Sequence, residues 1–247
     1  MSVGCFIIAR LNSSRLPEKN ILDINGKPMI INLINRISES KYIDEIIICT
    51  SKEKTDDALE RVAKEYKVKI FRGSLENIMD RIINCANYYG INDIVEILGD
   101  NPLIDNHLLD FVLEEYVNNQ LDYCTNISLD YKKELLQAEY KCFPIGLRVQ
   151  VYKTIIAKEY VNYTDANFIS EHPTNFIFEN SKKFKTKFLQ TDKKWDFLNL
   201  HKLNFAVNKK NQYENVKKIF NYFNHENFSL KDMVKFIDSN NIDFTNN

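Results

Sequence analysis

The stretch "VGCFIIARLNSSRLPEKN", Val3–Asn20, decides how the rest of the chain is interpreted. It opens with a short apolar run that is typical of a buried strand. The part from Ala9 to Asn20 then carries two arginines, a lysine, two serines and a proline, but no glycine. So much positive charge at the end of a buried strand requires an explanation from the surrounding chain.

The first half of the chain alternates between strand-type and helix-type patterns. Four further apolar runs follow, separated by amphipathic segments with helical spacing. These runs are "EIIICTS" (45–51), "VKIFRG" (68–73), "DIVEILGD" (93–100) and "LDYCTNI" (121–127). The alternation predicts an α/β fold, with a mostly parallel Rossmann-like sheet flanked by helices. Ligands bind beyond the carboxyl ends of such strands, so the polar loops after the first four strands are expected to meet at one edge.

The second half is less regular. We expect a β-hairpin insertion around residues 130–152, which ends in "FPIGLRVQVYK". A helix in "TIIAKEYVN" (154–162), strands in "KTKFLQT" (185–191) and "LNFAVN" (203–208), and two helices near the C-terminus are expected after it. Because no linker rich in proline, glycine or serine interrupts the pattern, we predict one domain over residues 1–240 and a polar tail at 241–247.

The composition excludes several classes of protein. Of 247 residues, 33 are basic and 34 acidic, and this balance argues against a nucleic-acid-binding protein. The five cysteines form no C-x-x-C pair and mostly lie in apolar runs, which indicates a reduced cytoplasmic protein. The apolar runs are too short for a signal peptide or a membrane span, so no membrane association is expected.

The charged segment Arg10–Lys19, called the basic loop below, suits a polyphosphate. Arg10 and Arg15 offer planar guanidinium groups, Lys19 offers a mobile charge, and Ser13 and Ser14 offer hydroxyls. A solvated surface loop is an equally good interpretation of these residues alone. Neither the G-x-x-x-x-G-K-[ST] motif nor G-x-G-x-x-G is present.

"LGDNPLID", Leu98–Asp105, is a candidate metal-binding loop. Asp100 follows an apolar strand and Gly99, and Mg²⁺ typically takes one or two protein carboxylates together with phosphate oxygens and waters. Asp105 is expected to cap the helix that begins near Asn106.

Two other segments combine polar residues in a suggestive way. In "FRGSLENIMDR", Arg72 or the backbone of Gly73 could contact a nucleobase or ribose, whereas Asp80 and Arg81 could equally form a surface ion pair. In "SEHPT", Glu171 and His172 stand without the serine or cysteine nucleophile of a hydrolase, and no histidine or cysteine has zinc-ligand spacing.

Taken in order, these segments resemble one family. "FIIARLNSSRLPEKNILDINGKPMIINLINRI", "FRGSLENIMDR", "ILGDNPLID", "FPIGLRVQVY" and "SEHPTNFI" resemble cytidylyltransferases such as CMP-Kdo synthetase and acylneuraminate cytidylyltransferase. The branch named after spore coat polysaccharide biosynthesis protein F is the most similar. The resemblance covers roughly residues 3–177 and implies an α/β nucleotidyltransferase fold.

The resemblance also implies a reaction. CMP would pass from CTP to an acidic sugar or related anionic acceptor, with Mg²⁺ as cofactor and pyrophosphate as product. Residues 1–128 would be the nucleotide-binding half, and residues 129–240 would bind the acceptor and form a homodimer. The enzyme would serve the biosynthesis of a surface polysaccharide or glycoconjugate.

The resemblance assigns roles by position, in three groups. Arg15, Lys19 and Asp100 would be catalytic, and Asp100 would hold Mg²⁺. The nucleotide would be bound by Ala9, Arg10, Ser13, Ser14, Arg72, Gly73, Ser74, Asp80 and Gly99. The acceptor would be bound by Arg148, Gln150, Glu171 and His172.

The sequence departs from the family pattern at four positions. Glu18 replaces a glycine, Arg148 and Gln150 replace two acids, and Asn208 replaces an aspartate that helps to bind metal in relatives. Asparagine is a weaker ligand for a hard cation, so Asn208 is an uncertain metal ligand. A catalytically impaired CTP-binding relative is therefore an alternative. A glycosyltransferase is a further alternative, although the D-x-D spacing is missing.

Overall fold

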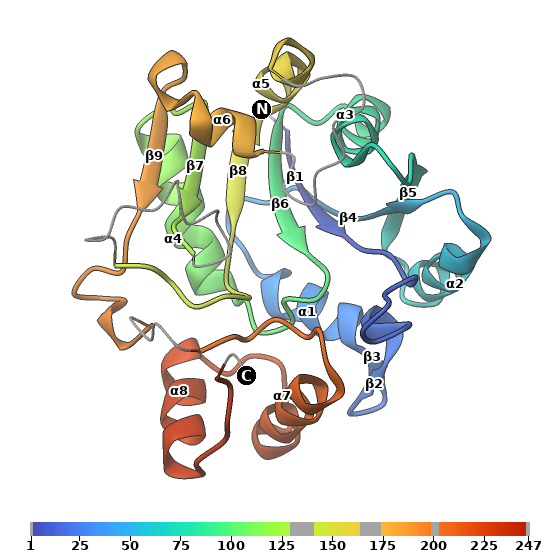
Figure 1. The fold of residues 1–247 in the computed structure, drawn as a ribbon, viewed down its shortest axis with the longest axis vertical. Coiled ribbons are helices and arrows are strands. Elements are labelled where there is room, and N and C mark those ends of the chain that lie inside the picture. Colours follow the sequence, from blue (N-terminus) through green and yellow to red (C-terminus); the bar gives the residue numbers. More distant parts are fainter. Residues whose placement is uncertain (1, 129–140, 164–173, 199–202, 246–247) are drawn as a thin grey trace.

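The fold is centred on a seven-stranded sheet, with the strand order β5-β4-β1-β6-β8-β7-β9 (Figure 1). The computed structural model describes residues 2–128, 141–163, 174–198 and 203–245. The strands are β1 (Val3–Ile8), β4 (Glu45–Ser51), β5 (Lys69–Gly73), β6 (Asp93–Leu98), β7 (Tyr123–Asn126), β8 (Gln150–Lys153) and β9 (Thr186–Leu189).

All sheet pairings are parallel except those of β8, which runs antiparallel to both β6 and β7. β1 lies between β4 and β6, and its residues form a wholly apolar run because both faces of a parallel sheet are covered. The predicted mostly parallel α/β sheet is confirmed.

Helices cover both faces of the sheet and build a hydrophobic core on each. Their bounds are α1 (Met29–Ile37), α2 (Asp57–Glu65), α3 (Ile78–Tyr89), α4 (Asn106–Asn118), α5 (Thr154–Lys158), α6 (Asn175–Glu179), α7 (Lys210–Phe223) and α8 (Leu230–Ser239). One core contains residues of α1, α2, α4, α7 and α8, and the other contains residues of α3, α5 and α6. All five cysteines are buried, as expected.

Helix ends follow the local sequence signals. α3 ends at Gly90, which adopts the left-handed conformation that glycine tolerates. α4 begins after Asp105, whose carboxylate accepts a hydrogen bond from the backbone N–H of Leu108 at 2.9 Å. The predicted capping role of Asp105 is therefore confirmed.

A small hairpin beside α7 was absent from our sequence-based prediction (Figure 1). Its strands are β2 (Asp23–Ile24) and β3 (Lys27–Pro28), and both turn residues have positive φ, 54° for Asn25 and 78° for Gly26. Asn-Gly is the turn sequence that two-residue hairpins favour, so the signal was present in the sequence.

The predicted strand over residues 203–208 is wrong, since its residues form only isolated bridges. Its backbone N–H groups bond to three separate places: Asn204 donates to Phe244, Phe205 to Ile145, and Val207 to Asp100. The predicted hairpin insertion falls partly on residues 129–140, outside those described, and its last residues belong to β8. Among the described residues, no helix has the length and apolarity to span a bilayer.

Candidate active site

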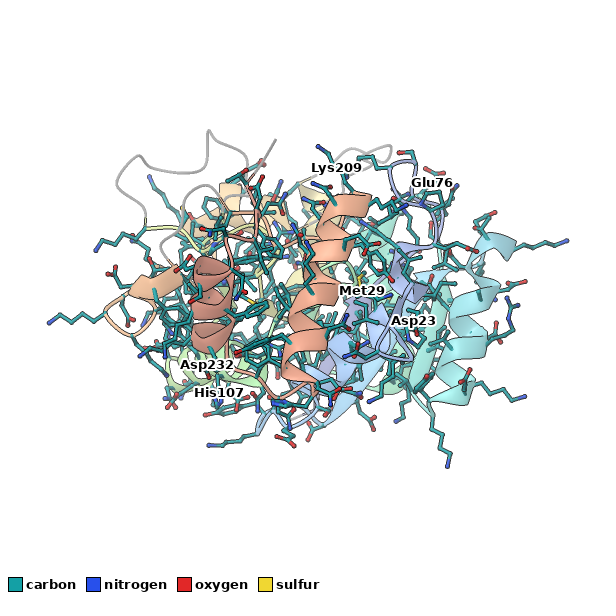
Figure 2. The ribbon with its side chains drawn as sticks, turned by 90° about the horizontal axis from the view of Figure 1, so that it is seen from below. Asp23, Met29, Glu76, His107, Lys209 and Asp232 are labelled. Atoms are coloured by element: carbon teal, nitrogen blue, oxygen red, sulfur yellow. The ribbon has the colours of Figure 1, made fainter. Side chains whose placement is uncertain are left out.

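The loop after β1 borders a pocket of about 200 Å³ at the carboxyl edge of the sheet. Four parts of the chain form its walls: this loop, the end of β6, the first turns of α3, and the segment before α7. The lining residues are Ile8, Ala9, Arg10, Ser13, Ser14, Arg15, Lys19, Asn20, Ile78, Arg81, Leu98, Asp100 and Asn208. Figure 2 places Lys209, next to Asn208, and Glu76, in the loop before α3, at the same margin of the molecule.

Leu11 anchors the basic loop. Its side chain is buried, and its backbone N–H donates to a carboxylate oxygen of Asp56 at 2.8 Å. Its carbonyl accepts from the backbone N–H of Glu18 at 3.0 Å, which closes the loop. Asp56 is fixed in turn by the hydroxyls of Thr50 and Ser51 at the end of β4. The loop is thus tied down at its base, while its arginines and serines line the pocket.

Glu18 does not oppose a ligand in this pocket. It is exposed and is not among the lining residues. Its φ of 56° lies in the left-handed region, where glycine is the least strained residue. This backbone geometry accounts for the glycine at this position in the family pattern. The next residue, Lys19, begins a 3-10 helix over Lys19–Ile21 that turns its side chain inward.

Four side chains from three segments meet at the pocket. The Lys19 Nζ atom lies 2.6 Å from Asp100 Oδ2 and 2.9 Å from Asn208 Oδ1. The Nη2 atom of Arg15 donates to the same Asn208 oxygen at 3.0 Å. The Lys19 side chain is only 11% exposed and that of Asp100 19%, so this ion pair is partly shielded from solvent.

The Asp100 carboxylate fits a divalent cation better than any other group here. Its Oδ1 atom is buried and has no hydrogen-bond partner among the described residues. A carboxylate oxygen is the kind of donor that Mg²⁺ prefers. Among the described residues, no cluster of three or more histidine, cysteine or acidic side chains could hold a metal ion.

The structure divides the predicted nucleotide-binding residues into two groups. Residues from the basic loop line the pocket, and Gly99 packs beside it, because a Cβ there would lie 3.0 Å from atoms of Ala9 and Asn20. The second group, Arg72, Gly73, Ser74 and Asp80, does not line it.

Arg72 is held by groups outside the pocket. Its guanidinium forms ion pairs with Asp57 and Glu60 of α2, at 2.7 and 2.6 Å. It also donates to the backbone carbonyls of Ser51 and Glu53. A nucleotide contact by Arg72 would require these bonds to break, so its assignment stays a prediction.

Arg81, for which the sequence left a surface ion pair open, is a buried residue of the pocket. It lines the pocket from α3, is almost completely buried, and has an Nε atom without a partner among the described residues. Its Nη1 donates to the carbonyl of Ser74 at 3.2 Å. Gly73 leaves room for it, since a Cβ there would lie 2.7 Å from Arg81 Cγ. Gly73 and Ser74 therefore border the site indirectly, through Arg81.

Gln150, a predicted acceptor residue, is buried within a polar network. Its Oε1 accepts from the hydroxyls of Tyr123 and Thr174, and its Nε2 donates to Glu96 at 3.2 Å. Burial raises the pKa of Glu96, which the Tyr152 hydroxyl partly offsets by donating to it. This arrangement fits a supporting role for Gln150 better than direct contact with a small molecule.

Of the other predicted acceptor residues, Arg148 is the one among the described residues. Arg148 is buried. Its charge lowers the pKa of Glu96, but the burial of Glu96 raises that pKa and has the larger effect. Glu171 and His172 lie outside the described residues. Their assignments stay predictions.

Comparison with protein families shows to which family the chain belongs. The family model described as cytidylyltransferase matches residues 5–242, nearly the whole chain. The chain belongs to the cytidylyltransferase family. The predicted family is thereby confirmed.

Individual relatives agree with this assignment. The chain is 25% identical over 222 residues to the spore coat polysaccharide biosynthesis protein SpsF of Bacillus subtilis, covering 87% of this chain and 85% of the relative. A solved structure of a cytidylyltransferase from Leptospira borgpetersenii superposes with a TM-score of 0.84, at 26% identity and with 100% and 98% of the two chains covered.

A more distant cytidylyltransferase structure shares the fold. CMP:2-keto-3-deoxy-manno-octonic acid synthetase in complex with CTP matches with a TM-score of 0.63. The identity is 16%, and the match covers 90% of this chain and all of the other. The α/β nucleotidyltransferase fold is therefore shared well beyond close relatives.

Proposed function

We propose that this family member transfers CMP from CTP to an acidic sugar or related anionic acceptor and releases pyrophosphate. One observation carries the proposal: Arg15 and Lys19 of the basic loop, Asp100 from the end of β6, and Asn208 meet in a single pocket. The family description, cytidylyltransferase, supports a cytidine nucleotide as donor, and the structure of the distant relative is a complex with CTP.

The basic loop would hold the triphosphate. Arg10, Arg15 and Lys19 line the pocket from one wall and would neutralise negative charge on the phosphate oxygens. In phosphoryl-type transfers, catalysis consists mostly of positioning and charge stabilisation, which fixed cations supply without reorganisation. An in-line attack by the acceptor oxygen on the α-phosphorus would expel pyrophosphate toward this wall.

Asp100 would hold Mg²⁺ through its unpartnered Oδ1 atom. When bound, the metal would supply charge neutralisation at the phosphates. Lys19 holds the Asp100 side chain in place through Oδ2, which leaves Oδ1 without a protein partner among the described residues.

Two observations support an anionic acceptor. Arg81 lines the wall opposite the basic loop and adds a positive charge suited to a carboxylate or phosphate. The relatives include a polysaccharide biosynthesis protein and a synthetase named for a sugar acid. We also propose that the chain acts as a homodimer in the cytoplasm, which sedimentation of the purified protein and cell fractionation would test.

A pyrophosphate-release assay tests the reaction. Each of the four nucleoside triphosphates is incubated with Mg²⁺ and a panel of sugar acids and sugar phosphates. We expect release only with CTP and with one class of anionic acceptor. Binding of CTP without turnover on any acceptor would instead support the impaired relative. Turnover with another nucleotide would contradict the proposed donor.

A further inference from the structure

We propose that Asn208 is a positioning residue that holds Lys19 and Arg15 together for the triphosphate, and that it is not a metal ligand. This inference rests on the proposed function, because it assumes that the pocket binds a triphosphate. It gives a specific role to a position where the family pattern has an aspartate.

The hydrogen bonds fix which atom of Asn208 faces the two cations. Lysine and arginine side chains only donate, so the atom 2.9 Å from Lys19 Nζ and 3.0 Å from Arg15 Nη2 must be the amide oxygen. A carbonyl oxygen has two lone pairs, and both are engaged by these donors. A metal ion could bind this oxygen only by displacing Lys19 or Arg15.

The backbone around Asn208 is tied to the site on both sides. The N–H of Val207 donates to the carbonyl of Asp100 at 2.8 Å. The N–H groups of Asn208 and Lys209 both donate to the side-chain oxygen of Gln212, in the first turn of α7, at 2.8 and 2.9 Å. The amide is therefore presented from a fixed backbone, as a positioning role requires.

A neutral acceptor suits this role better than a carboxylate. Lys19 and Arg15 repel each other, and a shared hydrogen-bond acceptor offsets part of that repulsion. An aspartate would attract both cations strongly and would compete with a phosphate for them. With asparagine, Lys19 pairs with one carboxylate, that of Asp100, and Arg15 keeps its full charge for the ligand.

Asn208→Leu tests the inference, because it keeps the volume and removes the acceptor. Inorganic tripolyphosphate binding is measured by calorimetry at low salt, first in EDTA and then with Mg²⁺. We expect affinity to fall about tenfold in both conditions, since the cations lose their common partner. Asn215→Leu is the matched control: the Nδ2 atom of Asn215, near the middle of α7, donates to the carbonyl of Asp243, and binding should not change.

A metal ligand would behave differently. If Asn208 bound Mg²⁺, Asn208→Leu would lose affinity with Mg²⁺ and keep that of the unmodified protein in EDTA, and this result would overturn the proposal. Failure of the unmodified protein to bind tripolyphosphate in EDTA would also overturn it, because the cations are held together without metal.

Asn208→Asp provides a second variant that retains an acceptor. We expect a higher melting temperature without ligand, from ion pairs with Lys19 and Arg15, and weaker tripolyphosphate binding in EDTA. Unchanged binding in EDTA with tighter binding in Mg²⁺ would contradict the inference. Because tripolyphosphate carries no base, failure of CTP turnover leaves these results interpretable and counts only against the proposed function.

Discussion

At the scale of single residues, the contact between Lys19 and Asp100 defines the site. The two residues are 81 positions apart in sequence, yet Nζ and Oδ2 lie 2.6 Å apart. The basic loop supplies one and the end of β6 supplies the other. One Asp100 oxygen bonds the lysine, and the other has no hydrogen-bond partner among the described residues, so we propose that it holds the cation.

Asp100→Asn separates these two contacts. The amide can still accept a bond from Lys19, but it loses the charge that a divalent cation needs. We expect pyrophosphate release to fall at least about tenfold and to require more Mg²⁺, as for loss of a charge-assisted contact. Initial rates across a Mg²⁺ titration measure this, with exposed Asp238→Asn as control. An unchanged Mg²⁺ requirement would contradict the assignment of Asp100.

Replacing Arg72 and replacing Arg81 are expected to have different effects in the same assay. Arg81→Met keeps the stem that packs on Gly73 but removes the guanidinium from the pocket, so we expect kcat/KM for CTP to fall about tenfold. Arg72→Met removes ion pairs with α2, so we expect lower stability and an unchanged KM. If Arg72→Met raised KM more than Arg81→Met, the sequence-based assignment would be correct and the geometric one wrong.

The sequence predicts the basic loop and Asp100 because strand ends in a parallel sheet share one edge. It assigned Arg72 to the nucleotide and gave no site role to Arg81. The Arg72 side chain points toward Asp57 and Glu60 of α2. The sequence pattern does not show that these acids lie beside the strand of Arg72. The place of Arg81 depends on the space left by Gly73, which is a tertiary property.

At the scale of elements, Arg36 of α1 joins the segment between the C-terminal helices α7 and α8 to the loop after β6. Its guanidinium is buried and donates to the carbonyls of Leu103, Ile104, Glu226 and Phe228. It also lies 3.8 Å from the ring centroid of Phe228. Burial lowers the pKa of Arg36 to about 10, so the group stays charged at neutral pH.

Arg36→Leu tests how much these hydrogen bonds contribute to the stability of the fold. Four carbonyls would lose their donor inside the core, so we expect a loss of roughly 3–5 kcal/mol in the free energy of unfolding. Urea denaturation followed by circular dichroism measures it. Arg61→Leu, at an exposed position of α2, is the control and should change stability by less than about 0.5 kcal/mol. A similar small change for Arg36→Leu would show that the carbonyls find other donors.

Elements with strong apolar patterns were predictable, whereas irregular ones were not. β1, β4, β5 and β6 lie where their apolar runs predicted them. Residues 203–208 look like a strand in sequence, but their N–H groups bond to three separate segments. That irregular path brings Asn208 to Lys19, a contact that the predicted strand did not indicate.

At the scale of the whole molecule, the site depends on segments from both ends of the chain. The basic loop follows the first strand, and Asn208 precedes the last two helices. Between them stands the central strand β6, which leads into the Asp100 loop and contains the buried Glu96. Any change in the protonation of Glu96 therefore acts on the stability of the whole sheet.

Glu96→Gln is expected to make stability less sensitive to pH. Burial raises the pKa of Glu96 in the folded state, although Tyr152, Arg148 and Arg81 oppose the shift. The folded protein therefore favours the protonated form, and this contribution to stability is present at low pH and lost as pH rises through the raised pKa. Glutamine stays neutral and can still accept from Tyr152, so it avoids that loss.

The measurement is the melting temperature of the variant minus that of the unmodified protein, followed from about pH 8 to about pH 5. We expect a positive difference at the upper end, of about 2–4 °C for each kcal/mol regained, that shrinks toward acid pH. A difference that grows as pH falls would mean that Glu96 is stabilised as a carboxylate, with its arginine neighbours outweighing burial. The sign of this slope thus decides whether desolvation or charge pairing dominates beneath the site.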